Sequence, residues 1–295
     1  MSTQEKCLLL GFGDIAQRLS RRLSGRYQLS GVRRRSIAVN GIATFKADIA
    51  QPEQIRPILD DDFDVIVLTM TPSEMSDDGY RRAYVQTTQS VLNVLDDLSA
   101  RPRLIVFVSS TSVYGQQDGE WVDESSATEP GSYSGKRLLE AENLLRSSDY
   151  NHCCVRFSGI YGPGRRRLID QVLSGKGSHK TPIIYSNRIH AEDGAGILAH
   201  VIEKQSAKAH AKTIEALYLA SDCEPSPMYD VKVWLAKQLD LSPDALSPTE
   251  SSRQLGNKRC RNNRILTSGY RFQYPDYRTG YRRLINDLKA RGELF

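Results

Sequence analysis

The feature that most constrains this chain is a short apolar run followed at once by a glycine-rich turn. Residues 6–10 predict a buried strand, and the sequence GFGDIA from Gly11 to Ala16 opens a helix that continues to Leu23. The spacing matches Gly-x-Gly-x-x-Gly/Ala, which sets a pyrophosphate on a helix N-terminus. The motif alone is weak, so the rest of the chain must support it. The residues expected to contact a dinucleotide here are Gly11, Phe12, Gly13, Asp14 and Ile15.

Strands and helices alternate over the first two thirds of the chain. Apolar runs predict further strands at residues 27–32, 42–46, 65–68, 104–108, 152–157 and 217–219, with helices at 52–59, 79–98 and 133–146. Continuous apolar runs are typical of parallel strands buried on both faces. The pattern predicts an α/β fold with a Rossmann-type doubly wound parallel sheet. We expect residues 1–163 and about 187–204 to bind the dinucleotide, and about 164–186 and 205–295 to form a smaller C-terminal substrate domain.

Composition excludes several other classes of protein. The 295 residues contain no apolar run near the ~20 residues of a membrane helix and no signal peptide, so we expect a cytoplasmic protein without membrane partners. The five cysteines show no Cys-x-x-Cys spacing, which indicates buried free thiols in a reducing compartment. The net charge of +5 is modest and the arginine clusters are short, so no nucleic-acid partner is expected. The histidines lack metal-ligand spacing, so no metal is expected.

The strand predicted at 27–32 ends on three arginines, Arg33, Arg34 and Arg35. An acidic residue near this point holds the ribose 2′-hydroxyl of NAD, whereas arginine accommodates the 2′-phosphate of NADP. No carboxylate follows until Asp48, so NADP is favoured, with NAD or a solvated basic turn as the alternative. Asp48 and Ile49 are expected near the adenine, although Asp48 can equally cap the next helix. The polar run Thr69, Met70 and Thr71 follows the strand at 65–68, on the ligand side of such a sheet.

A cluster of hydroxyl side chains follows the predicted strand at 104–108. Four such residues, from Ser109 to Ser112, exceed what a turn needs, and the stretch 116–131 after them is typical of an active-site loop. A strong helix is then predicted from Tyr133 to Arg146.

The order of these motifs resembles the extended short-chain dehydrogenase/reductase superfamily, which includes nucleotide-sugar epimerases, dehydratases and reductases. The resemblance rests on the glycine turn, Asp48, the hydroxyls before Tyr114-Gly115, the Tyr133 helix, Arg156, Tyr161 to Gly164, and Ile189 to Asp193. In that superfamily a tyrosine exchanges a proton with the substrate, a lysine four residues later lowers the tyrosine pKa, and a hydroxyl holds the substrate oxygen.

The resemblance implies roles for particular residues. Ser110 and Thr111 would hold the substrate oxygen, and Tyr133 would be the acid/base. Ser109 and Tyr161 would lie beside the cofactor.

The chain departs from the superfamily at the lysine. Tyr133 is followed four residues later by Arg137, whereas Lys136 stands four residues after Ser132. Two registers are therefore open, and the Leu138-Leu139-Glu140 that follows favours Tyr133 with Arg137. Arginine would tune Tyr133 and hold the ribose, but it cannot relay a proton. The pattern is similar to an atypical branch of the superfamily.

These observations predict an NADP-dependent oxidoreductase or epimerase/dehydratase-like enzyme that acts on a small molecule. The alternative is an NADP-binding redox sensor or interaction protein with little turnover. Gly159 stands where many nucleotide-sugar enzymes have asparagine, which weakens a nucleotide-sugar substrate. The arginines at 165–167 either form a solvated face or meet an anionic substrate. The resemblance also implies a homodimer paired through the helices predicted at 79–98 and 133–146.

Overall fold

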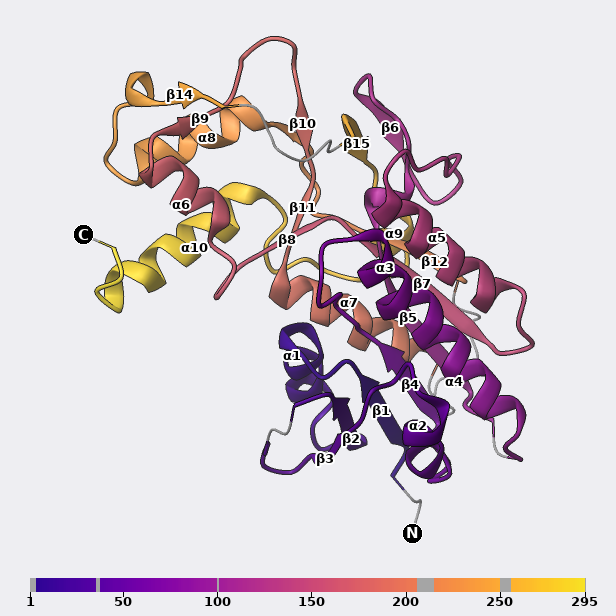
Figure 1. Ribbon diagram of the computed structural model, residues 1–295. Helices are drawn as coiled ribbons and strands as arrows, with labels where there is room; N and C mark the ends of the chain where they lie inside the picture. Colours follow the sequence, from indigo (N-terminus) through magenta and orange to yellow (C-terminus); the bar gives the residue numbers. More distant parts are fainter. Residues whose placement is uncertain (1–3, 36–37, 100, 206–214, 250–255, 295) are drawn as a thin grey trace. The chain divides into compact units, whose positions relative to one another are not determined.

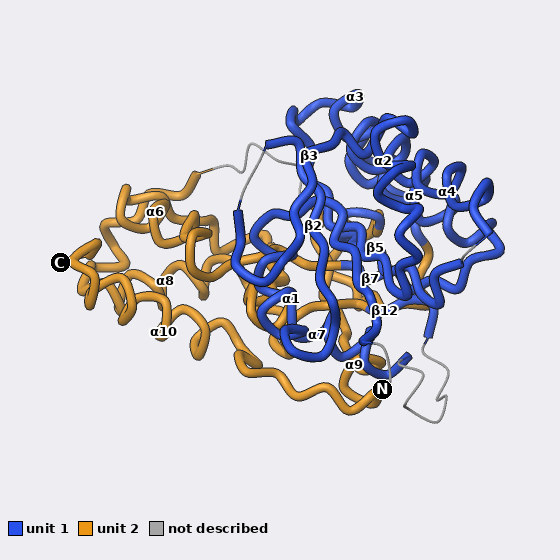
Figure 2. The backbone as a smooth tube through the Cα atoms, turned by 90° about the horizontal axis from the view of Figure 1, so that it is seen from below, with its two compact units in different colours: residues 1–113, 128–156, 195–218 blue, residues 114–127, 157–194, 219–295 orange. Residues whose placement is uncertain are grey.

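The computed structural model describes residues 4–35, 38–99, 101–205, 215–249 and 256–294 (Figure 1). The chain divides into two compact units, drawn in different colours in Figure 2. Unit 1 comprises residues 1–113, 128–156 and 195–218, and unit 2 comprises residues 114–127, 157–194 and 219–295. Each unit is therefore assembled from three separate stretches of the chain. The domain limits expected from the sequence stay a prediction.

Unit 1 is built on a parallel sheet of seven strands in the order β12-β7-β5-β4-β1-β2-β3. The strands are β1 (Lys6–Leu10), β2 (Gln28–Arg33), β3 (Ala43–Lys46), β4 (Val65–Leu68), β5 (Leu104–Ser110), β7 (His152–Phe157) and β12 (Leu217–Ala220), the last two ending in residues assigned to unit 2. The continuous apolar runs are buried as expected, because every residue of β4 is buried between covering helices. The predicted doubly wound α/β fold is confirmed.

Helices cover both faces of this sheet. They are α1 (Asp14–Leu23), α2 (Pro52–Leu59), α3 (Asp77–Tyr80), α4 (Thr87–Asp96), α5 (Tyr133–Arg146) and α7 (Ala191–Lys204), of which α7 begins in unit 2. Helices α2, α4 and α5 pack side by side on one face, and α1 lies on the other (Figure 1). Right-handed crossovers require this arrangement, because the connection from β1 to β2 runs toward one edge of the sheet and the connection from β4 to β5 runs toward the other edge.

The helix predicted at residues 79–98 is not one regular α-helix. The structure has the short α3, then a π-helix over Arg81–Gln86, and only then α4. π-helical turns are rare and occur frequently at functional sites.

Unit 2 is made of short strands around a helical core. Its strand pairs are β8 (Gly159–Tyr161) with β11 (Arg188–His190), β6 (Glu120–Val122) with β15 (Lys258–Cys260), β9 (Lys176–Gly177) with β14 (Ser247–Pro248), and β10 (Tyr185–Ser186) with β13 (Ser226–Pro227). Its helices are α6 (Arg167–Leu173), α8 (Met228–Gln238), α9 (Asn263–Thr267) and α10 (Tyr277–Ala290). Apolar side chains of α6, α8 and α10 form its core.

Two further observations concern the whole described chain. None of its helices in the described ranges is both long and apolar enough to cross a membrane. All five cysteines are free thiols; four are buried as expected, whereas Cys223 is exposed.

The order of strands reverses between β1 and β4. The chain runs outward from β1 to β2 and β3 on one side, and from β4 to β5 on the other. Leu10 pairs with both Val32 and Leu68, so the carboxyl ends of β1, β2 and β4 lie at the same level. Open α/β sheets bind ligands outside the carboxyl ends of the strands at such a reversal.

Candidate functional site

The glycine turn after β1 lies at this reversal and is shaped by two neighbouring strands. The amides of Gly11 and Phe12 both donate to the carbonyl of Val32, at 3.0 and 2.9 Å. Gly11 has φ +85°, and a Cβ there would lie 2.9 Å from backbone atoms of Thr69 and Met70. Only glycine satisfies both the backbone angle and this close approach.

Thr69, predicted to contact the cofactor, holds the glycine turn in place. Its buried hydroxyl donates to the carbonyls of Leu10 and Gly11, at 3.2 and 2.9 Å. The end of β4 and the turn after β1 are therefore tied together by one side chain. Any contact that Thr69 makes with a ligand would act on a residue that already fixes the turn.

The other residues of the turn divide between core and surface. Phe12 is fully buried, and its ring occupies the place of a Gly31 side chain, since a Cβ there would lie 2.6 Å from it. Only the backbone of Phe12 is therefore left for a ligand. Ile15 is also buried, whereas Asp14 forms an ion pair with Arg18 at 2.8 Å. Gly13 is the N-cap of α1 and has no side chain with which to cap the helix.

The three arginines at the end of β2 reach the surface. Arg33 is the last residue of the strand and half-buried, and Arg34 and Arg35 are exposed. Asp48, predicted near the adenine, accepts a hydrogen bond from Arg82 at 2.5 Å and one from the amide of Ala50 at 3.2 Å.

These contacts set the charge state of Asp48. Partial burial alone would raise the pKa of its carboxyl, but the hydrogen bonds and the positive charges of Arg82 and Arg34 hold it below the ordinary value. Ile49 beside it is buried, and the adenine contact stays a prediction. The backbone of Met70 lies next to Gly11, whereas Thr71 is exposed.

The hydroxyl cluster after β5 is split between two environments. Ser109 is buried and donates to Glu142 at 2.6 Å, and Glu142 also accepts two hydrogen bonds from Arg156, at 2.9 and 2.6 Å. Ser109 therefore ties β5 to α5 and β7. Ser110 is half-buried and accepts a hydrogen bond from the amide of Ser112. Ser112 Oγ is buried and has no hydrogen-bond partner within the described part of the chain.

Helix α5 begins tightly against this hydroxyl turn. Ser132 caps the helix by accepting from the amide of Gly135 at 3.2 Å. A Cβ at Gly135 would lie 2.2 Å from the carbonyl oxygen of Ser112 and 2.6 Å from Pro130. Sequence reasoning missed Gly135, because nothing in its neighbours shows which strand end the helix meets. The close approach places Tyr133, the first residue of α5, beside the turn after β5.

Tyr133 and Arg137 share one face of α5; Tyr133 contacts the segment before α3, and Arg137 contacts the first residue of α3. Tyr133 is 40% exposed and its hydroxyl donates to the carbonyl of Met75 at 2.7 Å. Its ring meets Tyr80 edge to face at 5.5 Å. Arg137 donates from Nε and Nη2 to the two oxygens of Asp77, at 2.8 and 2.7 Å.

The guanidinium of Arg137 also donates to Glu140 at 2.8 Å. Hydrogen bonds to Asp77 and then Glu140 raise its pKa above the ordinary value. Its positive charge is therefore shared with two carboxylates, which sequence reasoning did not foresee.

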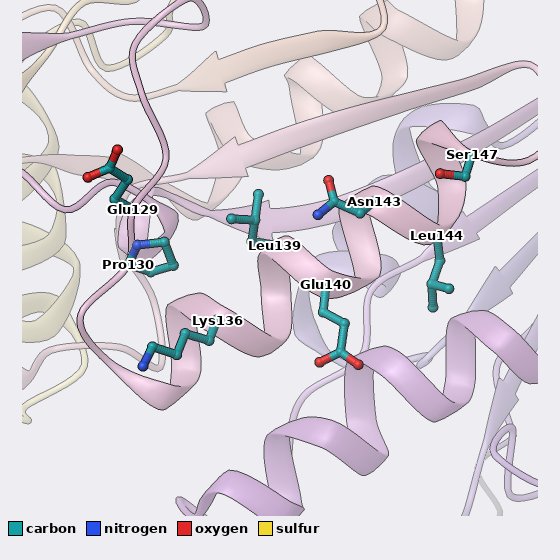
Figure 3. Close-up of a pocket in the computed structure, with 8 residues that line it drawn as sticks. All are labelled: Glu129, Pro130, Lys136, Leu139, Glu140, Asn143, Leu144 and Ser147. Atoms are coloured by element: carbon teal, nitrogen blue, oxygen red, sulfur yellow. The ribbon is translucent and has the colours of Figure 1, made fainter.

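Lys136, the cation of the other register, lies elsewhere on α5. Figure 3 shows it with Leu139, Glu140 and Asn143 along an open hollow of about 600 Å³. The Ser132 hydroxyl is occupied in capping the helix. In the alternative that pairs Ser132 with Lys136, the serine hydroxyl therefore caps the helix and the lysine lies along the hollow.

Tyr161, predicted beside the cofactor, lies in unit 2. It is 3% exposed, stacks on Tyr281 with ring centroids 4.4 Å apart, and contacts His190 edge to face at 5.2 Å. Burial raises the pKa of its hydroxyl, which finds no hydrogen-bond partner among the residues that the structure describes. A Cβ at Gly280 would lie 1.8 Å from this hydroxyl, so α10 packs directly on it. The cofactor role of Tyr161 stays a prediction.

Asp193, near His190 in sequence, has a structural role in unit 2. It accepts hydrogen bonds from the Tyr270 hydroxyl and from the amides of Gln273 and Tyr274, each at 2.8 Å. Within the described ranges no group of three or more His, Cys, Asp or Glu side chains is arranged to hold a metal ion.

Comparison with known proteins gives consistent matches along the whole chain. Residues 6–290 match the family described as the RmlD substrate binding domain. Protein YeeZ of Escherichia coli K12 is 26% identical over 289 residues, which cover 92% of this chain and 97% of that protein. A structure from Methylobacillus flagellatus, provisionally described as an NAD-dependent epimerase/dehydratase, is 34% identical with a TM-score of 0.80, and the match covers 97% of this chain and 100% of that one.

A more distant solved structure shares the fold. DesIV of Streptomyces venezuelae, a dTDP-glucose 4,6-dehydratase crystallised with NAD, has a TM-score of 0.80 at 18% identity, with 98% of each chain covered. DesIV shows the fold alone, and the family is settled by the match over residues 6–290 and by the 34% identical structure. The chain belongs to the RmlD substrate binding domain family, of the extended short-chain dehydrogenase/reductase type, and has the epimerase/dehydratase-like NAD-binding fold.

Proposed function

We propose that this protein is an NADP-dependent oxidoreductase or epimerase/dehydratase-like enzyme that acts by hydride transfer at a carbonyl or alcohol of a small molecule. One observation carries the proposal. Tyr133 presents a partly exposed, hydrogen-bonding hydroxyl at the first residue of α5, where that helix packs on the hydroxyl-bearing turn after β5. Hydride transfer at a carbonyl needs a proton donor of this kind, held on a rigid element.

The residues at the glycine turn fit a dinucleotide. Gly11 leaves no side chain between β1 and β4, and α1 begins without a capping side chain, which suits a diphosphate at its N-terminus. When bound, the nicotinamide of such a cofactor supplies or accepts the hydride. The exposed guanidiniums of Arg34 and Arg35 support NADP over NAD, because they can pair with a 2′-phosphate.

The chemistry of the protein's own residues follows from their chemical types. Tyr133 would give its proton to a carbonyl oxygen, or take one from an alcohol, as hydride moves. Ser110 and Thr111 would donate hydrogen bonds to that oxygen as its charge grows. Arg137 would hold the ribose and stabilise the tyrosinate only to the extent that Asp77 and Glu140 leave its charge available.

A basic hollow in unit 2 supports an anionic substrate. It has a volume of about 440 Å³ and is lined by Arg165, Arg166, Arg167 and Lys176, with Asp170 as a carboxylate among them. Arg166 is paired with Asp170 at 2.9 Å, but Arg167 and Lys176 are exposed. A diphosphate-bearing sugar has the matching charge, and the similar fold of MoeE5 was solved with UDP-glucuronic acid and NAD. Gly159 in place of the usual asparagine favours another anionic small molecule over a nucleotide sugar.

The Tyr133→Phe variant tests the hypothesis that the protein is an enzyme with Tyr133 as its acid/base. We expect NADPH-coupled turnover, measured by NADPH absorbance on a panel of nucleotide sugars and small anionic carbonyls, to fall by about 100-fold or more. The dissociation constant for NADPH should not rise, because only the phenol oxygen is lost and the ring is kept. A variant that turns over at the wild-type rate would refute Tyr133 as the acid/base.

The second candidate is a redox sensor with little turnover, and the missing lysine favours it. Arg137→Lys separates the two. In an enzyme this substitution changes the turnover rate, because lysine, unlike arginine, can relay a proton. In a sensor it changes only the affinity for NADPH. A pH–rate profile that is flat near neutrality would also favour the sensor.

A further inference from the structure

One segment of unit 1 contacts both halves of the proposed site. Residues 69–80 run from the end of β4 through α3 to the start of the π-helix. At the first end the Thr69 hydroxyl donates to the Gly11 carbonyl at 2.9 Å. Toward the other end the Met75 carbonyl accepts from Tyr133 at 2.7 Å, and Asp77 clasps Arg137 by two hydrogen bonds.

The middle of this segment is tightly folded on itself. Ser76 caps α3 by accepting from the amide of Gly79 at 3.1 Å. A Cβ at Gly79 would lie 2.3 Å from the carbonyl oxygen of Glu74, so residues 74–79 form one compact turn. We therefore expect residues 74–79 to move together as one unit.

Apolar packing does little to hold the segment down. Met75 is 57% exposed, and Ser73 and Glu74 are also exposed. Met75 and Asp77 contact α5 through polar groups, whereas Tyr80, at the end of the segment, packs its ring on Tyr133. Exposed ion pairs such as that of Asp77 with Arg137 contribute little to stability. Segments held this way open at low free energy compared with core elements.

The contacts of this segment occupy the groups that the proposed chemistry uses. Tyr133 has a single hydroxyl proton, and the structure commits it to the Met75 carbonyl. The planar fork of Arg137 is committed to Asp77 through Nε and Nη2. A substrate oxygen and a ribose would each have to replace one of these partners.

We infer that residues 72–77 form a strap that latches Tyr133 and Arg137, with Asp77 as a positioning residue, and that nucleotide binding at the glycine turn releases it. The inference rests on the proposed function. Thr69, three residues before the strap, is bonded to the glycine turn, so a nucleotide seated there would contact the segment 69–80 that carries the strap. A ligand shifts such an equilibrium only by its preference for one state, so the released state must bind NADPH more tightly.

This coupling makes an unusual prediction, since removing an ion pair should strengthen binding. Asp77→Asn breaks the charged clasp on Arg137 and raises the released fraction. We expect NADPH affinity to rise by about two- to fivefold, the range open to an exposed ion pair. Asp78→Asn is the matched control, because it removes the same charge one residue later, where the Asp78 carboxylate lies at a long 3.7 Å from Arg81. Asp77→Glu, which keeps the charge, should restore affinity toward wild type.

Methionine NMR reports the strap directly. The chain has four methionines, and Met70 and Met75 both lie in this segment, whereas Met228 lies in α8. With ¹³C-methyl methionine and Met75→Leu for assignment, NADPH should shift the signals of both Met70 and Met75. In Asp77→Asn without nucleotide, the Met75 signal should already have moved toward its NADPH-bound position, and in Asp78→Asn it should not.

The outcomes separate the strap from the cofactor proposal. If NADPH binds and shifts Met70 but leaves Met75 in place, or if both aspartate variants bind NADPH equally, the strap is overturned and cofactor binding stands. If no NADPH binding is detected in any of these proteins, the cofactor proposal fails and the strap fails with it.

Discussion

The buried network of Ser109, Glu142 and Arg156 gives the sharpest stability prediction for unit 1. These side chains are 3%, 0% and 2% exposed, and they join β5, α5 and β7. Glu142 accepts hydrogen bonds at 2.6 Å from Ser109 and at 2.9 and 2.6 Å from Arg156. Glu142→Ala leaves the positive charge of Arg156 buried without the Glu142 carboxylate that balances it.

The cost is set by the uncompensated charge. Breaking a buried ion pair by removing one partner costs about 3–5 kcal/mol, a large fraction of the total stability of roughly 5–15 kcal/mol of a typical domain. The exposed Arg146, 3.8 Å from Glu142, cannot replace the lost charge, since it is itself positive. We expect the thermal midpoint to fall by roughly 10 °C.

Urea unfolding followed by circular dichroism measures this loss. The matched control replaces the whole network by apolar residues, Ser109→Ala with Glu142→Leu and Arg156→Met, and it should recover most of the stability because no charge stays buried. A single Glu142→Ala variant within about 1 kcal/mol of wild type would refute the claim that this network is desolvated. So would a triple variant less stable than the single one.

Two further predictions test local features. Gly11→Ala should destabilise the protein by about 3 kcal/mol or more and abolish NADPH binding, because its Cβ meets the backbone that follows β4. Gly25→Ala has a similar φ of +78° but open space around it, and it should destabilise the protein by only about 1 kcal/mol. Equal losses of stability in urea unfolding would contradict the steric reason. Asp222 is 1% exposed, and burial raises the pKa of its carboxyl to about 8, against the opposing charge of Arg188. The native state then keeps a proton that the unfolded state releases above about pH 4, so stability should fall by about 1 kcal/mol per pH unit from pH 4 to 8 and then level off. Asp222→Asn should remove this slope, and a variant with the wild-type pH dependence would show that another group is responsible.

Much of the fold of unit 1 could be predicted from local sequence patterns. The expected limits of β1, β4, β7 and α5 agree with the structure, because continuous apolar runs bounded by turns specify buried strands almost unaided. The helix at 79–98 was wrong in detail. The sequence RRAYVQ has ordinary helical residues, and its π-helical geometry arises where Tyr84 packs edge to face on Phe107 of β5, a contact that periodicity does not reveal.

Some features of the candidate site could likewise be predicted from the sequence, and others could not. The glycine turn could be read from sequence because its strand, turn and helix are contiguous, and the arginines after β2 because they follow directly on a strand. The partners of Tyr133 and Arg137 could not, since Met75 and Asp77 lie about sixty residues away and no motif marks them. The prediction that Arg137 simply replaces lysine rests on charge alone, and its two carboxylate partners are a property of the folded unit.

The central claim is that unit 1 binds NADP through the glycine turn and the arginines after β2, and calorimetric titration with NADPH and NADH tests it most directly. We expect one NADPH per chain, bound at least about tenfold more tightly than NADH, since a charged hydrogen bond contributes about 1.5–3 kcal/mol. Arg34→Ala with Arg35→Ala should remove that preference and leave NADH affinity unchanged, whereas Arg21→Ala, an exposed charge in the last turn of α1, should change neither. Absence of binding, or equal affinity for the two nucleotides in wild type and double variant alike, would contradict the account.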